Sequence, residues 1–293
     1  MTFSKKYNEI KSLCSDELSI IEEKMISDIS LIQPLDKMVK DFLLYPSKRV
    51  RSTLATLIVK AGKNMVTDEQ LEVLSVVELI HNASLIHDDV IDDDKLRRGH
   101  KTLSAEFDNK LAIISGDYLL SLAMQKLVKL KNLEVINLFC KTIEKMCLGE
   151  VEQNFSKYKI GTLEQYLEKT KNKTAYLFET ALLSCMMLGA NKSYLARISK
   201  IGINIGIAFQ IRDDILNFTG TDDTKPSNSD LREGIYNAPV ILGEKTDNWV
   251  SGIEKTKILL NNYIKEAVDE LSYLGENKYQ SAIMNFLELL RDV

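Results

Sequence analysis

The residues best suited to chemistry are crowded into Asp88–Lys101, where five acids and several cations follow an apolar helical run. The acids are Asp88, Asp89, Asp92, Asp93 and Asp94, and the first cations after them are Lys95, Arg97 and Arg98. Because Asp88 and Asp92 are spaced i and i+4, they share one face of a helix about one turn apart. Like charges at this spacing repel one another, so we expect a cation between them. Hard oxygen ligands with room for water suit Mg²⁺.

A solvated helix end, an EF-hand and a zinc site fit this stretch less well. A solvated helix end is disfavoured because the acids lie at the C-terminal end, where the helix dipole opposes negative charge. An EF-hand needs Gly at the sixth loop position and Glu at the twelfth, but counting from Asp88 places Asp93 and Gly99 there. Zinc is suggested by the three histidines of the chain, but their spacing matches no usual zinc pattern and no Cys is near. They are His81, His87 and His100.

A second acidic helix end lies in Ala208–Phe218, where Gln210, Asp213 and Asn217 share one helical stripe beside Asp214. A single helix of this kind is often an ordinary polar face. Two acidic helix ends facing each other would be tolerated only around several divalent cations. Such cations in turn imply a polyanionic substrate, such as a diphosphate.

The sequence predicts that the elements that position these acids are all helices. We expect a central helix that begins at a capping box, Thr67–Gln70, and ends in the first acid cluster. Gly202 and Gly206 indicate a close approach of two helices. The segment Thr219–Pro239 is rich in turn formers and is predicted to be a mobile surface loop. The other expected helices are Lys6–Leu31, Leu35–Leu44, Arg51–Ala61, Ser104–Leu130, Leu133–Ser156, Leu163–Leu188 and Ala190–Phe218, with weaker segments from Ile241 to Arg291.

The whole-chain composition favours one all-α domain over residues 1–293, since 45% hydrophobic residues with 4 Pro and 13 Gly allow a large core with few breaks. The net charge of −4 argues against a nucleic-acid partner. We expect neither a signal peptide nor a transmembrane segment, because the uncharged runs are too short to cross a bilayer. The four cysteines form no C-x-x-C pair, so we expect buried, reduced thiols and a cytoplasmic protein.

Between about Lys48 and Pro239, the motifs and their order along the chain resemble those of the trans-isoprenyl diphosphate synthases, the polyprenyl synthetases. Asp88–Asp92 resembles the first DDxxD motif of that family and Asp213–Asn217 the second, where most members carry a third Asp. Ser47–Ser52 is similar to the GGKRLRP loop with its glycines and proline lost. Ile235 stands where many relatives have Lys. Further matches are Gly149-Glu150, Gln153, Lys173-Thr174, Phe209-Gln210 and Lys225-Pro226.

The resemblance implies a prenyltransferase of all-α bundle fold, with a deep central cavity, that uses Mg²⁺ to join isopentenyl diphosphate to an allylic diphosphate. It assigns the Mg²⁺ ligands to Asp88, Asp92 and Asp213. Arg97, Lys173 and Lys225 would neutralise the allylic diphosphate, and Thr174 and Gln210 would lie beside the reacting carbons. Isopentenyl diphosphate would be held by Lys48, Arg51, His81 and Arg98. A homodimer is also implied.

The product is expected to be long, because small residues precede the first acid cluster. The resemblance gives short-chain members an aromatic ring at the positions that hold Ala83 and Ser84 here. The tail would then run down the central helix until a residue of the facing helix stops it, and Met124 is the candidate. The alternatives are a short-chain farnesyl or geranylgeranyl synthase, a catalytically weak subunit of a heteromeric synthase, a head-to-head synthase or terpene cyclase, and a cation-binding scaffold.

Overall fold

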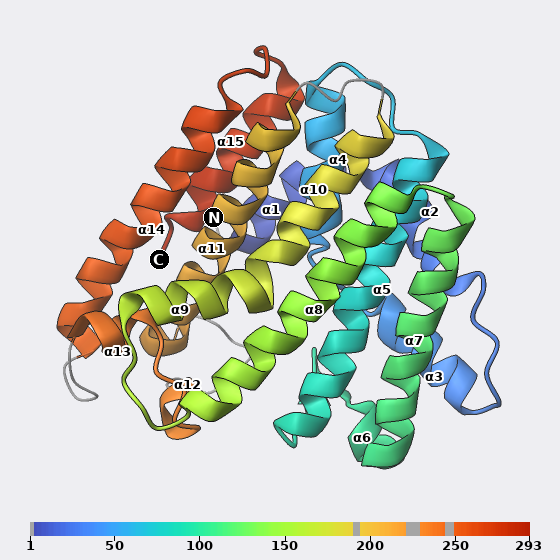
Figure 1. Cartoon of the computed structure of the whole chain (residues 1–293), viewed down its shortest axis with the longest axis horizontal. Coiled ribbons are helices and arrows are strands. Elements are labelled where there is room, and N and C mark those ends of the chain that lie inside the picture. The colour runs from blue at the N-terminus through green and yellow to red at the C-terminus, as the bar shows by residue number, and fades with distance from the viewer. Residues whose placement is uncertain (1–2, 190–193, 221–228, 244–248) are drawn as a thin grey trace.

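The computed structural model of the chain describes residues 3–189, 194–220, 229–243 and 249–293, and that part is almost entirely helical (Figure 1). The helices are α1 (Phe3–Ser12), α2 (Ser15–Ile26), α3 (Leu35–Leu44), α4 (Val50–Ala61), α5 (Asp68–Ile91), α6 (Leu103–Glu106), α7 (Asn109–Lys129), α8 (Leu133–Ser156), α9 (Leu163–Thr170), α10 (Tyr176–Leu188), α11 (Leu195–Thr219), α12 (Ser229–Arg232), α13 (Ala238–Gly243), α14 (Trp249–Leu271) and α15 (Lys278–Leu290). A π-helical turn, η1 (Lys171–Ala175), joins α9 to α10. The hairpin β1 (Leu96–Arg97) and β2 (His100–Lys101) follows α5. The predicted all-α fold is confirmed.

Helix α5 is the central element and carries the first acid cluster at its C-terminal end. It begins at the predicted capping box: Gln70 N donates to Thr67 Oγ1 at 3.2 Å and Thr67 N donates to Gln70 Oε1 at 2.9 Å. The helix packs along α7 and also contacts α2 and α10. Its apolar residues from Val73 to Ile80 are all buried, so the helix is fixed in the core and presents its acidic end at the edge.

Helix α10 lies against both α5 and α11 and so links the two acidic helices. The predicted close approach at Gly202 and Gly206 is confirmed. A Cβ atom added to Gly202 would lie 2.5 Å from Glu179 Cα of α10, and one added to Gly206 would lie 2.5 Å from Ala175 Cα of η1. Only glycine allows α11 to come this near to η1 and α10. This approach brings the polar end of α11 beside η1.

Several helix boundaries match the sequence prediction and others do not. The helices Leu35–Leu44 and Leu133–Ser156 are confirmed as predicted. The expected helix Lys6–Leu31 is divided into α1 and α2, although its buried positions continue at helical spacing through the break. The expected helix Ser104–Leu130 restarts at Asp108, whose side chain accepts a hydrogen bond from Leu111 N at 2.7 Å and caps α7.

The expectation of four buried thiols is wrong for two of them. Cys14 and Cys185 are buried, but Cys140 and Cys147 are exposed on the outer face of α8. This face and that of α7 also expose large apolar side chains: Ile113, Ile114, Val128, Leu133, Leu148, Val151 and Phe155. Helix α7 is long and apolar enough to cross a membrane by length and composition, although it packs along α5 as a core helix does. Together α7 and α8 form an apolar outer surface.

The predicted loop Thr219–Pro239 contains more regular structure than the sequence suggested. Residues 221–228, including Lys225, lie outside the described part of the chain. After them come α12 and the first residues of α13. Ile235 N donates to Asp230 O at 2.8 Å, and Gly234 O accepts from Tyr158 N at 2.7 Å. The second half of this segment is therefore tied to itself and to the turn after α8.

Candidate active site

The first acid cluster forms where α5 ends. Asp88 lies in the last turn, and the backbone N–H of Asp92 donates to Asp88 O at 2.8 Å. Burial raises the pKa of Asp88 to about 6. Lys173 opposes this rise, whereas the negative charges of Glu150 and Asp92 add to it. The carboxylate of Asp88 is thus crowded by other acids and only partly compensated by a cation.

Lys173 reaches the acid cluster from η1. Its Nζ lies 2.5 Å from Glu150 Oε2, and although burial works against its charge, Asp88 and Glu150 hold the pKa of Lys173 above its usual value. Helix α8 can approach η1 because residue 149 is glycine: a Cβ there would lie 2.7 Å from Lys173 N. The π-helical geometry displaces this turn from an α-helical path, as such turns often do at functional sites.

The polar end of α11 forms a chain of hydrogen bonds with η1 and α9. Thr174 Oγ1 donates to Gln210 Oε1 at 2.8 Å, and Gln210 Nε2 donates to Asp214 Oδ1 at 2.9 Å. Tyr166 OH donates to Asp214 Oδ2 at 2.6 Å. Burial is the main cause that raises the pKa of Asp214 to about 7. Asp214 therefore orients Gln210, while the neighbouring Asp213 has a side chain that is 40% exposed.

A further carboxylate lies beside Asn217. Asn217 Nδ2 donates to Asp230 Oδ1 at 3.2 Å, and Asn237 Nδ2 donates to Asp230 Oδ2 at 2.7 Å. Asp230 belongs to α12, so the acid comes from a different element than α11. Most members of the family that the motifs resemble have an acid at position 217. Here an amide at that position holds the carboxylate of Asp230 instead.

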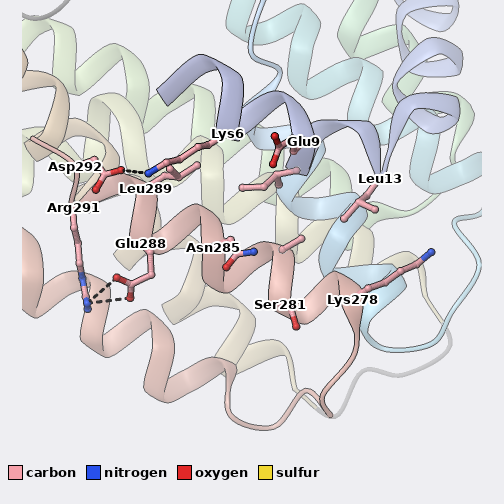
Figure 2. A pocket seen from close by; sticks show the side chains of 12 residues that line it. Lys6, Glu9, Leu13, Lys278, Ser281, Asn285, Glu288, Leu289, Arg291 and Asp292 are labelled. Carbon is pink, nitrogen blue, oxygen red and sulfur yellow. Dashed lines mark hydrogen bonds and ion pairs between the residues drawn. The ribbon is translucent and has the colours of Figure 1, made fainter. Parts of the chain in front are cut away.

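Both acidic helices border one polar cavity of about 190 Å³. Its lining includes Asp92, Gln153, Lys169, Lys173, Thr174, Gln210, Asp214, Asp230, Glu233 and Ile235. A larger cavity, of about 710 Å³, lies between α1 and α15 (Figure 2). Four of its charged residues form ion pairs, Lys6 with Asp292 at 2.9 Å and Arg291 with Glu288 at 3.0 Å. We place the chemistry at the smaller cavity because Asp92, Lys173, Thr174 and Gln210 of the predicted set line it. The other two predicted acids, Asp88 and Asp213, are not among the residues that line the cavity.

A cluster of cationic side chains around His81, which we call the basic pocket, comes from α4, α5 and the β1–β2 hairpin. The guanidinium of Arg51 is buried and lies 4.6 Å from the centroid of the Phe178 ring. Burial lowers the pKa of Arg51 to about 10, against the opposing charges of Glu78 and Asp213. Burial is the largest of the causes that hold the pKa of His81 well below its usual value, and the positive charges of Arg51 and Arg98 lower it further. His81 is therefore neutral at pH 7.

Three donors near this pocket are buried without a hydrogen-bond partner among the described residues: Ser47 Oγ, Arg51 Nε and Arg98 Nη1. Buried donors are almost always paired, and leaving one unpaired costs about 1–3 kcal/mol. Burial, Arg49 and Arg97 all lower the pKa of Arg98, so positive charge is concentrated here. An anion with several acceptor oxygens would satisfy these donors and relieve the repulsion between them.

The remaining predicted residues are placed as follows. Lys48 is exposed, with its Nζ 5.1 Å from the centroid of the Phe3 ring, and Arg97 Nε lies 2.5 Å from Asp89 Oδ1. Ala83 is buried in the core, and Met124 packs against the core from α7. Ser84 Oγ donates to His81 O at 2.8 Å.

The sequence analysis missed a buried ion pair behind the basic pocket. Arg49 Nη1 lies 3.1 Å from Glu78 Oε2, and Ser52 Oγ donates to Glu78 Oε1 at 2.6 Å. Arg49 has the left-handed φ of 52° at the start of α4. The one available signal was Glu78, an acid within an otherwise apolar run, which indicates a buried pair. Through this ion pair, the loop that contains Lys48 is attached to the middle of α5.

The carboxylates at the end of α5 are suited to a Mg²⁺ ion that also binds the phosphates of a substrate. In the described residues no three His, Cys, Asp or Glu side chains lie close enough to hold a metal by themselves. Mg²⁺ usually keeps several waters and takes one or two carboxylates together with substrate phosphates. Asp88 and Asp92, whose negative charges crowd one another at the end of α5, supply ligands of this kind.

Comparisons with known proteins identify the family of the chain. The polyprenyl synthetase family matches residues 32–274. Heptaprenyl diphosphate synthase component 2 of Geobacillus stearothermophilus is 36% identical, over 98% of this chain and 97% of that protein. Solanesyl-diphosphate synthase 1, mitochondrial, of Oryza sativa subsp. japonica is 30% identical, over 90% of this chain and 73% of that protein.

Solved structures agree as well. The heptaprenyl diphosphate synthase of Staphylococcus aureus aligns with a TM-score of 0.83 at 25% identity, covering 100% of this chain and 99% of that one. The decaprenyl diphosphate synthase of Rhodobacter capsulatus has the same fold, with a TM-score of 0.88 at 22% identity over 98% of each chain. With two acidic helices at one cavity, a basic pocket beside it and a family match over most of its length, this chain belongs to the polyprenyl synthetase family of prenyltransferases.

Proposed function

We propose that this prenyltransferase uses Mg²⁺ to condense isopentenyl diphosphate head-to-tail onto an allylic diphosphate, and that its product is a long-chain polyprenyl diphosphate. The observation that carries the proposal is the pairing of two sites of opposite charge. Asp92, at the end of α5, and Asp214 of α11 line one cavity, and Arg51 of the basic pocket lies near enough to Asp213 of α11 for that charge to act on it. An enzyme that joins two diphosphate esters needs one anion site for each substrate.

Isopentenyl diphosphate would occupy the basic pocket. Arg51 and Arg98 carry buried N–H donors that lack partners in the described part of the chain, and Ser47 adds a hydroxyl. Guanidinium groups match the paired oxygens of a diphosphate and remain charged when buried. The neutral His81 can donate one hydrogen bond without adding to the repulsion between the arginines.

The allylic diphosphate would lie between the two acidic helices. When bound by Asp88, Asp92 and Asp213, Mg²⁺ would neutralise the departing diphosphate and so lower the barrier to ionisation. Lys173 stands at the same cavity and would contact the outer oxygens. Glu150 holds this lysine in place until substrate arrives, because the two side chains are ion-paired at 2.5 Å.

The carbon chemistry then needs orientation and the exclusion of water. The isopentenyl double bond attacks the allylic cation, and the proton that is lost passes to the departed diphosphate. Thr174 and Gln210 are bonded to each other at 2.8 Å and would turn neutral oxygen dipoles towards the cation. A neutral dipole stabilises passing positive charge without forming a bond to it.

Support for a long product comes from the relatives and from α5. The relatives with at least 30% identity named above are heptaprenyl and solanesyl synthases. The two residues Ala83 and Ser84, which come before the first acid cluster, have small side chains. Each turn of α5 below Asp88 adds about 5.4 Å of depth along which a tail could extend.

The active form would be an assembly of two subunits joined through the apolar surface of α7 and α8. Val128, Leu133 and Phe155 are each more than 60% exposed there, and several large apolar side chains exposed on one side of a protein mark a contact surface. A homodimer is the first candidate. A second component is the alternative, because relatives from Geobacillus stearothermophilus and Bacillus subtilis are named as component 2 of a heptaprenyl diphosphate synthase.

The two-site proposal is tested by comparing substrates. Arg51→Ala and His81→Ala should raise the KM for isopentenyl diphosphate at least about tenfold, since a charge-assisted hydrogen bond contributes roughly 1.5–3 kcal/mol. The KM for farnesyl diphosphate should change little. Steady-state rates with each substrate varied in turn provide the measurement. Equal increases in both KM values would show that the pocket has been assigned to the wrong substrate.

A further inference from the structure

Two rings join the segments that flank the basic pocket. Tyr45, at the end of α3, stacks on His100 of β2, with 3.8 Å between the ring centroids and 11° between the ring planes. Tyr45 stands three residues before Lys48. His100 is the cross-strand partner of Arg97 and follows the turn Arg98-Gly99. The family resemblance gives neither ring a role, and the proposed reaction does not use them directly.

Each segment is separately anchored at its other end. On the loop side, Tyr7 OH donates to Lys48 O at 2.9 Å, Lys11 Nζ donates to Ser47 O at 2.8 Å, and Phe42 meets the edge of the Tyr45 ring. On the hairpin side, Thr102 N donates to Lys95 O at 3.1 Å, and Arg97 Nε lies 2.5 Å from Asp89 Oδ1, which ties β1 to α5. These contacts fix the bases of the loop and the hairpin. None of them joins the loop directly to the hairpin.

The hairpin presents Arg98 in a conformation that depends on the strands around it. Arg98 and Gly99 have φ values of 52° and 80°, which is the pattern of a two-residue type I′ turn. A two-stranded hairpin of this size is not stable by itself in water. It must therefore be held from the side, and the stacked ring of Tyr45 lies against its second strand.

Repulsion within the pocket makes such a contact useful. Arg49, Arg51, Arg97 and Arg98 all act electrostatically on His81. Arg49 is paired with Glu78 and Arg97 with Asp89. Arg51 and Arg98 each keep a buried N–H donor without a partner among the described residues. Before an anion binds, these like charges push the hairpin and the loop apart. A contact between the two segments would keep the donors at the separation that a diphosphate needs, and would lower the ordering cost of binding.

We infer that Tyr45 and His100 are positioning residues, a surface clamp that holds Arg98 at a fixed distance from Lys48 and Arg51 for recognition of isopentenyl diphosphate. This inference rests on the proposed function. His100 is exposed and does not fill the core, whereas Tyr45 is half-buried and packs against the edge of the core. The clamp joins the two segments of the basic pocket. Arg97, which is assigned to the allylic diphosphate, lies on the same hairpin but is held separately by Asp89 of α5, so we expect the loss of the clamp to act on isopentenyl diphosphate.

The test is a double-mutant cycle with His100→Ala, Tyr45→Ala and the combined variant. Each single variant should raise the KM for isopentenyl diphosphate about 2- to 10-fold, the factor that corresponds to an aromatic pair of this kind. The kcat and the KM for farnesyl diphosphate should stay within about twofold, because the clamp touches neither. The double variant should be no worse than either single one.

Conservative variants separate positioning from stability. His100→Phe and Tyr45→Phe keep two flat rings in contact and should restore the wild-type KM, even if the midpoint of thermal unfolding shifts. Lys101→Ala, one residue further along β2, is the matched control and should leave every KM unchanged. If the single effects multiply in the double variant, or if both substrates lose affinity equally, there is no clamp. Wild-type protein that does not consume isopentenyl diphosphate would instead overturn the proposed function and this inference with it.

Discussion

At the scale of single residues, the site contains two buried carboxyls with different tasks. Asp88 has a pKa raised to about 6 by burial and is surrounded by Lys173, Glu150 and Asp92. Asp214 has a pKa raised to about 7 by burial and is enclosed by Tyr166 and Gln210. The first has charged neighbours that a cation would balance. The second has its oxygens occupied, so its task is to orient Gln210.

Replacement of an acid that we propose as a Mg²⁺ ligand should strongly lower activity without harming the fold. Asp88→Asn or Asp213→Asn should lower kcat by more than about 100-fold, since even indirect changes at metal sites cost roughly 10–100-fold. The metal-free Asp88→Asn protein should unfold at a slightly higher temperature, because a buried charge repelled by Glu150 is removed. Steady-state kinetics, thermal unfolding in EDTA and Mn²⁺ binding followed by electron paramagnetic resonance measure these effects. Near-wild-type kcat and Mn²⁺ affinity would show that these acids hold no metal.

At the scale of elements, the sequence predicted the helices that have clear caps and missed the irregular turns. The capping box at Thr67 and the Asn132 cap before Leu133 mark real helix starts. No residue pattern distinguished the π-helical turn at Lys171–Ala175 from the α-helices on either side. Its position follows from tertiary packing: Gly149 of α8 and Gly206 of α11 allow two helices to press on η1. Such packing cannot be read from local periodicity.

The close approach at Gly149 should be essential for the placement of Lys173. In Gly149→Ala the new Cβ would lie 2.7 Å from Lys173 N, so α8 and η1 must separate. We expect a loss of about 1–3 kcal/mol in the free energy of unfolding, typical of overpacking. We also expect kcat to fall at least about tenfold, because small displacements of catalytic groups are costly. Urea unfolding and initial rates measure the two effects.

Gly275→Ala is the matched control, since a Cβ there meets nothing within 4 Å. It should leave stability and kcat unchanged. A Gly149→Ala enzyme with normal kcat would mean that the geometry of η1 does not set the position of Lys173.

At the scale of the whole molecule, the all-α class and the pairing of two acidic helices could be predicted, but the arrangement around them could not. The carboxylate beside Asn217 comes from Asp230 of α12, which nothing in the local pattern indicated. The clamp between Tyr45 and His100 joins residues far apart in the chain. Both depend on how distant segments of the chain meet, which cannot be predicted from the patterns of a single sequence.

The path of the product tail should be revealed by a bulky residue in α5. Ala83 is buried, so a tyrosine there needs either open space or a costly rearrangement. If a tail channel passes this position, Ala83→Tyr should shorten the products while the first condensation and the midpoint of thermal unfolding stay near wild type. Met124→Ala should lengthen the products. A variant that loses stability and keeps its product lengths would show that Ala83 is only a core residue.

The most direct test of the central claim is the product made by the purified chain. The protein is incubated with Mg²⁺, farnesyl diphosphate and labelled isopentenyl diphosphate, and the chain lengths of the labelled products are resolved by reversed-phase chromatography. Asp88→Asn and EDTA serve as controls that should abolish incorporation. We predict label in polyprenyl diphosphates longer than twenty carbons. The absence of Mg²⁺-dependent incorporation by the chain alone, or a product that stops at fifteen or twenty carbons, would contradict the proposed function.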